Sequence, residues 1–574
     1  MQISDIIAND LRQDGDRVWR LVSHESFNYS DGVASERYLR HVFSTASDLT
    51  SQSTELESYI KDWPSEYHLT RKRAQLLAPL TFDRSLRVLE VGCGCGAITR
   101  HLGENFDQVV SVEGSIERAR LARLRAKDLD SVSVVCSPFQ SIQFKQKFDI
   151  IFCIGVFEYS GAFILGDDPY RRVLDYFSDI LAPGGILVVA IENQFGLKYF
   201  NGAREDHLGT YFEGIEGYHR HPGRARTFGK TELEDLLRPQ FPHVRFFYPY
   251  PDYKIPECVL SDDFLASGFA GELVSQIRSR DYSGPMKTRW DETLVNLDLA
   301  RNRQLEFFAN SFLVVAGKGE LPPNMFNQLG VLYSNRVTKA YSTQTRIVRG
   351  SDGTLAAEKV PLATASTGAA ATLRPTISAW SDGVSLSTLL RQRAQASRSV
   401  AELFEPCRSW IALLESESFA KGDRMMLDGG HVDSVWGNTY PQGASCELID
   451  REWVWNGDLP RNVVVIRAIY DFLSSTETLE LKALNNLPRS GKTAIRSIAT
   501  SIGTDLFDAD FEDFMEVEAK LVNLTAGLSL DSTKNKIKWF LLDRPSRGLA
   551  RRVHPWISSF TSRVETKLQN LRYR

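Results

Sequence analysis

The sequence has few cysteines and no long apolar run. Seven cysteines are spread over 574 residues, which is too sparse for the disulfide framework of a secreted protein, so we expect reduced thiols and a cytoplasmic location. The longest apolar runs, such as GGILVVAI, fall well short of the roughly 20 residues that span a bilayer. The N-terminal segment also lacks the basic and apolar regions of a signal peptide, so we expect no export.

The chain also lacks an excess of charge of either sign. It has 68 Lys and Arg against 72 Asp and Glu, a net charge of −4. A general nucleic-acid-binding protein is usually basic, so we expect no nucleic-acid partner. Hydrophobic residues make up 43% and charged residues 24% of the sequence. This balance is typical of globular proteins, and the length predicts two or three domains.

The pattern along the chain predicts four segments. Residues 1–80 are polar and mostly helical in pattern, and we expect a helical cap whose last helix follows a loop and begins near Thr70. From 81 to 320, near-continuous Val/Ile/Leu runs such as LRVLEVG alternate with helical patterns, which indicates a parallel sheet in an α/β domain. A Gly/Pro-rich stretch separates it from an α+β segment at 330–530, and a basic tail occupies 531–574.

A glycine-rich turn is the strongest functional signal. In LRVLEVGCGCGAITRHL a strand containing Glu90 leads into Gly92, Gly94 and Gly96, and a helix follows. Glycines let a ligand approach the backbone, and the helix N-terminus offers unpaired N–H groups. The next strand ends in Glu113, where an acid can accept both ribose hydroxyls of an adenosine. The order of elements favours a nucleoside cofactor over a plain tight turn, with a dinucleotide and S-adenosylmethionine as candidates.

Together, E-V-G-C-G-C-G, Glu113, FDIIFCIGVFEY and LAPGGILVVAIEN resemble the motif series of class I S-adenosylmethionine-dependent methyltransferases, over roughly residues 67–318. The resemblance implies a Rossmann-like seven-stranded sheet in which SFLVVAGKG runs antiparallel, and this strand favours a methyltransferase over a hydride-transfer enzyme. It also implies site roles. The methionine part would be held by Glu90, Gly92, Gly94 and Gly96, the ribose by Glu113, and the methyl-transfer site would be bordered by Gly155 and Glu158.

Two parts of this cofactor site stay open. The family often has an acid near the end of the third strand that binds the adenine amine; here the segment reads VVCSPFQSI, so Ser137 or the nearby backbone would make this contact. Tyr67 precedes the first strand, where the family commonly covers the cofactor, and packing under Trp63 is the alternative. We interpret Cys93 and Cys95 as small turn residues, because no second Cys/His pair accompanies them as metal ligands.

The segment after the fifth strand supplies the catalytic candidate. Ligands bind at the carboxyl ends of the strands in open α/β sheets. The polar residues within reach of this edge are Glu192, Asn193, Lys198, Tyr199, Glu205, Asp206 and His207. His207 is a general-base candidate by its side-chain type, with Asp206 or Glu205 as its orienting partner. A divalent metal held by these three residues and a solvated helix start on a lid are the alternatives.

Longer stretches resemble a narrower group. WPSEYHLTRKRAQLL, AIENQFGLKYFNGAREDH, RTFGKTELEDLL and YPYPDYKIP are similar to bacterial proteins of surface-polysaccharide and O-antigen synthesis, a group that includes bifunctional methyltransferase–kinases. The resemblance implies a glycan or glycolipid acceptor that is methylated on a hydroxyl or phosphate. The alternatives are a small-molecule methyltransferase with a substrate-binding C-terminal domain and a non-catalytic scaffold in polysaccharide assembly.

The second half resembles a kinase. An H-x-D motif at Asp433, followed by Asn438 and Asp450, has the spacing of a kinase catalytic loop and metal-binding acid. The resemblance implies that Asp433 orients the acceptor, that Asn438 and Asp450 hold Mg²⁺, and that Lys359 contacts the phosphates of ATP. However, residues 360–381 contain no acid to pair with Lys359, and no glycine-rich loop precedes it. We therefore expect a kinase-like fold whose activity is open, with an unrelated α+β domain as the alternative.

The tail is strongly basic. Residues 534–574 hold 11 Lys and Arg and two acids, hence a net charge of +9. A helix from Pro555 would place its apolar residues on one face, namely Ile557, Phe560, Val564, Leu568 and Leu571. Such a helix can lie on an anionic membrane, which would make the protein peripheral to the inner membrane. It can equally bind a partner protein, a second copy of the chain or the acidic stretch 505–518.

Overall fold

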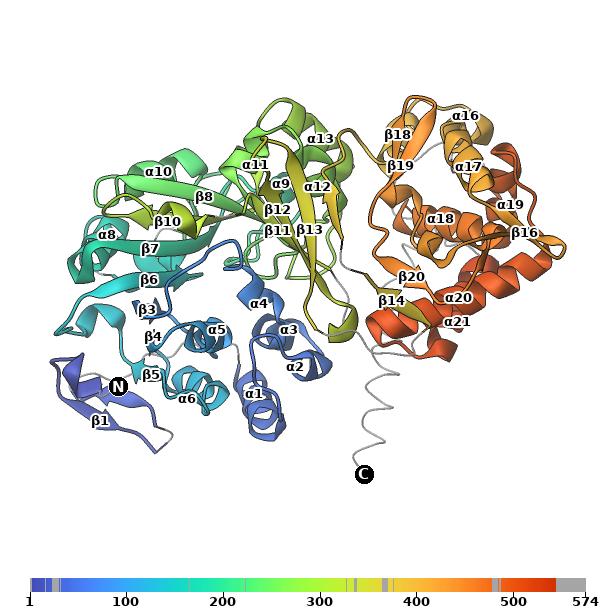
Figure 1. The fold of residues 1–574 in the computed structure, drawn as a ribbon. Coiled ribbons are helices and arrows are strands. Elements are labelled where there is room, and N and C mark those ends of the chain that lie inside the picture. The colour runs from blue at the N-terminus through green and yellow to red at the C-terminus, as the bar shows by residue number, and fades with distance from the viewer. Residues whose placement is uncertain are drawn as a thin grey trace. The chain divides into compact units, whose positions relative to one another are not determined.

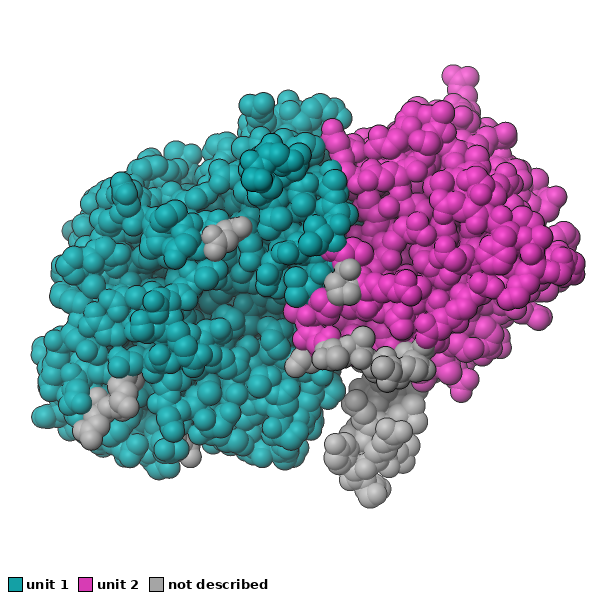
Figure 2. Space-filling model, in the orientation of Figure 1, with its two compact units in different colours: residues 1–335, 343–360, 377–380 teal, residues 336–342, 361–376, 381–574 magenta. Residues whose placement is uncertain are grey.

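The structure is a computed structural model that describes residues 3–15, 17–22, 30, 32–164, 166–221, 223–326, 328–334, 338–363, 370–374, 376–476, 484 and 487–542. The chain forms two compact units (Figure 2). Unit 1 comprises residues 1–335, 343–360 and 377–380, and unit 2 comprises residues 336–342, 361–376 and 381–574.

The centre of unit 1 is a sheet with a parallel core. Five parallel strands lie side by side (Figure 1), in the order β5 (Val132–Cys136), β4 (Gln108–Glu113), β3 (Arg87–Val91), β6 (Phe148–Ile154) and β7 (Leu181–Glu192). The strand β10 (Ser311–Gly317) then lies antiparallel between β7 and β8 (His243–Tyr250). This is the seven-stranded Rossmann-like arrangement that the sequence predicts, with SFLVVAGKG as its antiparallel strand.

Helices cover both faces of this sheet. On one face, strand residues such as Val88 and Val109 share an apolar core with α5 (Ala97–Asn105) and α6 (Ile116–Arg125). On the other face, Leu89 and Val110 share a core with α8 (Pro169–Ile180), α10 (Lys230–Leu237) and α12 (Ala270–Gln276). Because successive side chains point to opposite faces and both faces are covered, the strands read as continuous hydrophobic runs.

The sheet continues beyond these seven strands at both edges. The strands β1 (Leu11–Gln13) and β2 (Trp19–Leu21) extend it beside β5, so part of residues 1–80, predicted as a mostly helical cap, belongs to the sheet. Beyond β8 lie β9 (Cys258–Ser261), β11 (Gly330–Tyr333), β12 (Thr343–Arg349), β13 (Leu355–Pro361) and β15 (Ile377–Ala379). The second compact unit therefore does not begin at the predicted residue 330, because these segments pair with edge strands whose N–H and C=O groups need partners.

Four helices precede β3, namely α1 (Val33–Thr45), α2 (Thr54–Ser58), α3 (Trp63–Leu69) and α4 (Lys72–Gln75). A helix does begin near the predicted Thr70, namely α4 at Lys72, but the loop predicted before it is wrong, since α3 occupies Trp63–Leu69. Asp62 accepts a hydrogen bond from the N–H of Ser65 at 2.9 Å, and the Ser65 hydroxyl accepts one from the N–H of Asp62 at 3.0 Å. This reciprocal capping box satisfies donors at the helix N-terminus and explains the start of α3 at Trp63.

Several short helices follow the strands of unit 1. The helix α7 (Ser160–Phe163) comes after β6, and α9 (Leu197–Phe200) comes after β7. Between β8 and β10 the chain inserts β9, α11 (Asp262–Ala266), α12, α13 (Glu292–Arg301) and α14 (Leu305–Phe308). The first residues of this insertion, 251–257, reach the cavity described below.

Unit 2 is mainly helical around one apolar core. Its helices are α15 (Leu386–Arg393), α16 (Val400–Phe404), α17 (Cys407–Ser416), α18 (Arg461–Thr476), α19 (Gly491–Ser501), α20 (Asp508–Ala526) and α21 (Leu530–Leu542). Short strands accompany them, namely β14 (Ala371–Leu373), β16 (Phe419–Lys421), β17 (Arg424–Leu427), β18 (Thr439–Gln442), β19 (Ser445–Leu448), β20 (Trp453–Trp455) and β21 (Leu459–Pro460). The buried rings of Trp410 and Trp436 lie 5.9 Å apart in this core. The predicted tail helix from Pro555 lies outside the described residues.

Candidate functional site

A cavity of about 630 Å³ lies in unit 1, where β3, β4 and β6 end. Parallel strands present their carboxyl ends at one edge of a sheet, which is why residues distant in sequence meet there. The wall of the cavity includes these predicted site residues: Tyr67, Glu90, Gly92, Gly94, Glu113, Ser137, Gly155, Glu158 and His207. Gly96 is not among the lining residues.

Two glycines of the turn are in close contact with different parts of unit 1. Gly92 has a φ of +71°, and a Cβ atom there would lie 2.3 Å from a methyl group of Val156. Gly96 has a φ of +88°, and its Cβ would lie 2.7 Å from the Cα of Ala122. Gly92 therefore contributes bare backbone to the cavity wall, whereas Gly96 lets α5 pack closely against α6.

The carboxylate at the end of β4 faces the turn. Glu113 Oε2 accepts a hydrogen bond from the N–H of Gly94 at 2.8 Å, and Oε1 accepts one from the N–H of Ser115 at 2.9 Å. The side chain is buried, with 6% of its residue surface exposed. Two backbone donors fix its orientation, and each carboxylate oxygen keeps a second lone pair for a hydroxyl donor.

Glu90 lies at the end of β3 in a drier environment. The hydroxyls of Thr99 and Ser111 both donate to its Oε2, each at 2.7 Å. Burial raises the pKa of Glu90 to about 7, although both hydroxyl hydrogen bonds lower it. At neutral pH this carboxyl is therefore close to half ionised, and a cation bound in the cavity would favour its ionised form.

The predicted adenine contact is weakly equipped. The Ser137 hydroxyl donates to the carbonyl of Pro138 at 3.0 Å, and its backbone N–H donates to the carbonyl of Glu113 at 3.0 Å. Gln140 also lines the cavity, and the sequence interpretation missed it. Its carboxamide offers both a donor and an acceptor, so it is a second candidate at this end.

Tyr67 lies among residues that the sequence did not single out. Its ring is 5.6 Å from that of Trp63, so the packing alternative and the cavity position hold together. The Arg73 guanidinium lies 4.3 Å from the Tyr67 ring centroid and donates to the carbonyl of Tyr253 at 3.2 Å. A Cβ at Gly155 would lie 2.6 Å from the Tyr253 hydroxyl. Tyr253 comes from the insertion after β8, and no local spacing could have predicted it.

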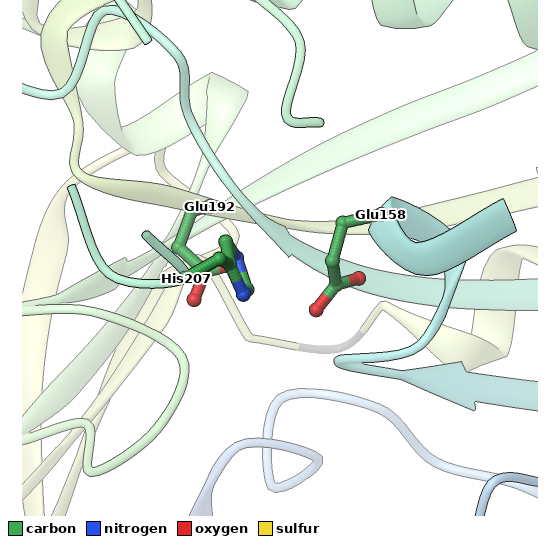
Figure 3. A group of neighbouring side chains, drawn as sticks. All are labelled: Glu158, Glu192 and His207. Carbon is green, nitrogen blue, oxygen red and sulfur yellow. The ribbon is translucent and has the colours of Figure 1, made fainter. Parts of the chain in front are cut away.

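The other end of the cavity wall holds a cluster of ionisable side chains (Figure 3). His207 Nε2 lies 3.1 Å from Glu192 Oε2, and His207 Nδ1 lies 3.1 Å from the Tyr159 hydroxyl. The orienting carboxylate is thus Glu192, not Asp206 or Glu205 as predicted. Asp206 instead pairs with two lysines, and Glu205 accepts the backbone N–H of His207 at 2.9 Å.

Two buried lysines neutralise the surrounding acids. Lys198 Nζ lies 2.7 Å from Asp206 Oδ2 and 3.3 Å from Asp252 Oδ2. Lys254 Nζ pairs with Glu192 Oε1 and lies 2.8 Å from Asp206 Oδ2. Burying charges is tolerated only when they are paired and hydrogen-bonded, so this network holds the segment after α9 against the insertion after β8.

The charges of this cluster shift its protonation. Burial alone would lower the pKa of His207, but the negative charge of Glu192 and its hydrogen bond outweigh burial and raise it to about 9. Burial and the charge of Glu192 raise the pKa of Glu158 to about 8. At neutral pH the His207 imidazole therefore carries a proton, and it must lose this proton before it can act as the predicted general base.

The predicted kinase-like residues divide between the two units. Lys359 is buried on β13 in unit 1, whereas Asp433, Asn438 and Asp450 belong to unit 2. In unit 2, the hairpin β18–β19 joins Asn438 to Asp450, and the N–H of Ile449 donates to the Asn438 carbonyl at 2.9 Å. The hairpin therefore brings the backbone of the two predicted Mg²⁺ ligands together.

Asp433 is tied down on both carboxylate oxygens. Arg467 Nη1 lies 2.8 Å from Asp433 Oδ1, and the Asn438 amide donates to Oδ2 at 3.2 Å. Arg467 also pairs with Glu518 at 2.8 Å, and these two carboxylates raise its pKa despite its burial. Asp433 is thus part of a buried ion-pair network in unit 2.

The similarity to known proteins lies in unit 1, around the cavity. Residues 89–189 match the family model described as "Methyltransferase domain". The match starts in β3 and ends in β7, so it spans the glycine turn, Glu113, Ser137 and Glu158. It confirms the predicted Rossmann-like methyltransferase domain as a domain type.

The relatives share only part of their length with this chain. The "Cyclopropane-fatty-acyl-phospholipid synthase" of Escherichia coli (strain K12) is 30% identical over 119 residues, which is 21% of this chain and 29% of that protein. The "Ubiquinone biosynthesis O-methyltransferase" of Bradyrhizobium sp. (strain ORS 278) is 30% identical over 113 residues, 19% of this chain and 41% of that protein. The chain therefore spans less than half the length of these relatives.

A likeness to solved structures is weaker. The N-methyltransferase NodS from Bradyrhizobium japonicum WM9, solved with S-adenosyl-L-homocysteine, is 19% identical, with 28% of this chain and 74% of that chain covered and a TM-score of 0.21. A likeness at this level bears on neither activity nor substrate. Within the part of the chain that the structure describes, no helix is both long enough and apolar enough to cross a bilayer.

Proposed function

We propose that the chain is an S-adenosylmethionine-dependent methyltransferase whose cofactor binds in the cavity of unit 1. One observation carries the proposal: the Glu113 carboxylate at the end of β4 is hydrogen-bonded to Gly94 of the glycine turn inside that cavity. The match of residues 89–189 to a methyltransferase-domain model supports the choice of cofactor over a dinucleotide. The cofactor supplies an activated methyl group on a sulfonium.

The residues of the cavity fit two parts of this cofactor, its ribose and its ammonium group. Glu113 presents fixed acceptors for a ribose, and the bare backbone at Gly92 admits a ligand that a side chain would exclude. Glu90 offers a buried carboxyl that a ligand ammonium would ionise. The acceptor atom would form its new bond to the methyl carbon while the carbon–sulfur bond breaks and the sulfur keeps the electron pair.

The acceptor that we propose is a hydroxyl or phosphate of a bacterial surface glycan or glycolipid. This choice rests on the sequence resemblance to proteins of O-antigen synthesis, and it is compatible with an acceptor approaching beside Glu158 and His207. Mass spectrometry of candidate glycolipids incubated with the protein and a labelled methyl donor tests it. Methylation of small hydroxylated molecules alone would instead favour the small-molecule alternative.

Calorimetry with S-adenosylhomocysteine tests the cofactor assignment. Glu113→Ala removes a charged acceptor of two hydroxyl hydrogen bonds, so we expect the affinity to fall by about 10- to 100-fold. Glu117→Ala is the matched control, because Glu117 lies nearby on α6 but forms exposed ion pairs outside the cavity. Equal affinities in the two variants, or no binding by the unaltered chain, would refute the assignment and favour a non-catalytic scaffold.

A second proposal concerns unit 2, which we infer binds a nucleotide with Mg²⁺. It is supported by the hairpin that brings Asn438 and Asp450 together behind an H-x-D motif. Because Arg467 and Asn438 engage Asp433, we expect phosphoryl transfer to be slow at best. ATP binding should require Mg²⁺ and be lost in Asp450→Asn but kept in Asp423→Asn, an exposed control. If the chain binds no nucleotide, an unrelated α+β unit is the better interpretation.

A further inference from the structure

Three side chains converge at the acceptor end of the cavity from three separate elements (Figure 3). Glu158 follows β6, Glu192 ends β7, and His207 lies in the segment after α9. One ligand atom from each lies within 4.8 Å of the others. Glu158 and Glu192 are 0% exposed, and the His207 side chain is 5% exposed. The group is thus gathered in one place and largely buried, and two of its members line the cavity.

The carboxyl group of Glu158 is buried without a hydrogen-bond partner in the part of the chain that the structure describes. Neither of its carboxyl oxygens has a hydrogen-bond partner among the described residues, although both are buried. Figure 3 shows its carboxyl group directed toward His207 and Glu192. A buried carboxyl without a partner costs free energy, so such a group in a folded protein calls for an explanation such as an ion or a ligand.

The distances fit a shared ion. Two ligands that each lie about 2.1 Å from a divalent metal, at a right angle, are about 3.0 Å apart. His207 Nε2 and Glu192 Oε2 are 3.1 Å apart, so they can exchange their hydrogen bond for a common ion with little movement, as the Nε2 proton is released to water. The Tyr159 hydroxyl is 3.1 Å from His207 Nδ1. If Nδ1 carries the proton and donates it to this hydroxyl, the Nε2 lone pair is available for the metal. Metal-bound histidines commonly donate their other ring N–H to such a second group, which fixes the tautomer.

Lys254 does not occupy the position of the proposed ion. Lys254 pairs with the other oxygen of Glu192, Oε1, and shares its charge with Asp206. Glu192 Oε2 therefore remains available on the side that faces His207, together with a carboxyl oxygen of Glu158. One imidazole and two carboxylates suit a first-row divalent metal ion, and three protein ligands leave positions open for an acceptor.

We infer that Glu158, Glu192 and His207 form a site for a divalent transition-metal ion that holds the methyl acceptor. This inference rests on the proposed function and narrows its acceptor to a group with a metal-binding oxygen. A hydroxyl bound there would have a lowered pKa and lose its proton to water. Its oxygen then bonds the methyl carbon, the carbon–sulfur bond breaks, and the sulfur retains the electron pair.

Titration of the chelator-treated full chain with Mn²⁺, followed by electron paramagnetic resonance, tests this site. The Asp450→Asn background removes the ion that we propose for unit 2, and asparagine tolerates the positive φ of 57° at this position. We expect one bound ion per chain, and a loss of affinity of about tenfold or more in Glu158→Gln and in His207→Ala. His219→Ala, which changes an exposed histidine, should leave Mn²⁺ binding unchanged.

Two outcomes of the Mn²⁺ titration in the Asp450→Asn background decide against the metal site. No Mn²⁺ binding at about 1 mM, or equal binding in Glu158→Gln, would overturn the metal site. Calorimetry with S-adenosylhomocysteine in the absence of metal separates the two proposals. Cofactor binding without Mn²⁺ binding overturns the metal site alone, whereas Mn²⁺ binding without cofactor binding overturns the methyltransferase and with it the role in holding an acceptor.

Discussion

If Glu90 holds the cofactor as we propose, we expect the affinity for the cofactor to depend on pH. The pKa of Glu90 is raised to about 7 by burial, from an ordinary value of 4.5. In the free protein the carboxyl is about one tenth ionised at pH 6 and about nine tenths ionised at pH 8. A bound cofactor ammonium would favour the ionised form and lower this pKa. We therefore expect the affinity for S-adenosylhomocysteine to rise about tenfold between pH 6 and pH 8, which is about 1.4 kcal/mol.

Glu90→Gln is the matched variant for this prediction. The amide oxygen can still accept from Thr99 or Ser111, but the side chain no longer titrates. Isothermal calorimetry at about pH 6, 7 and 8 in two buffers of different ionisation enthalpy gives both the affinity and the protons released. The unaltered chain should release about half a proton from Glu90 at pH 7, and the variant should lack this release. Any titration of the ligand itself appears in both proteins and cancels in the comparison.

The same shift has a consequence for stability. Because the folded-state pKa lies above the unfolded value, the unfolded chain ionises first as the pH rises from about 4.5 to 7, and the folded state loses up to about 3 kcal/mol relative to Glu90→Gln. Thermal unfolding of both proteins across this range measures the difference. The reasoning is refuted if the affinity is flat from pH 6 to 8, or if Glu90→Gln shows the same slope as the unaltered chain.

Three further variants test the packing around the two sites. Gly92→Ala would place a Cβ 2.3 Å from Val156 at a positive φ, so we expect cofactor binding to fall below detection in calorimetry while circular dichroism stays unchanged. Lys198→Met removes the buried cation that pairs with Asp206 and Asp252. We expect the free energy of unfolding of unit 1, measured in urea, to fall by about 3–5 kcal/mol. Arg467→Met leaves the two carboxylates that it bridges unpaired, and we expect a similar loss confined to unit 2, seen as a lower first transition in calorimetric scans. A loss below about 1 kcal/mol in either case would mean that solvent screens the pair.

Local patterns predicted the backbone geometry around the glycine turn. A strand, a glycine turn, a helix and a second strand ending in an acid follow one another within about thirty residues, and the backbone alone then brings Glu113 to Gly94. The antiparallel strand SFLVVAGKG was also predictable, and it pairs with β7 and β8 as expected. The helix α3 lies in a segment for which the sequence predicts a loop, because its start depends on the reciprocal hydrogen bonds between Asp62 and Ser65.

The acceptor half could not be predicted in the same way. The sequence placed Glu192 at the same sheet edge as His207 but favoured Asp206 or Glu205 as its partner, whereas the carboxylate that contacts the imidazole is Glu192 at the end of β7. Lys254, which pairs with Glu192, comes from an insertion after β8. Periodicity indicates which side of an element is buried, but it does not say which distant element covers that side.

The sequence by itself determined the type of sheet, the glycine turn and the acid that faces it, because each depends on residues that are neighbours along the chain or on adjacent strands. Only the tertiary structure decided that Glu158, Glu192 and His207 meet, and that β11, β12, β13 and β15 extend the sheet of unit 1. These outcomes depend on contacts between segments far apart in the chain. Such contacts are selected by the burial of whole surfaces and the pairing of buried charges, which no short window of sequence contains.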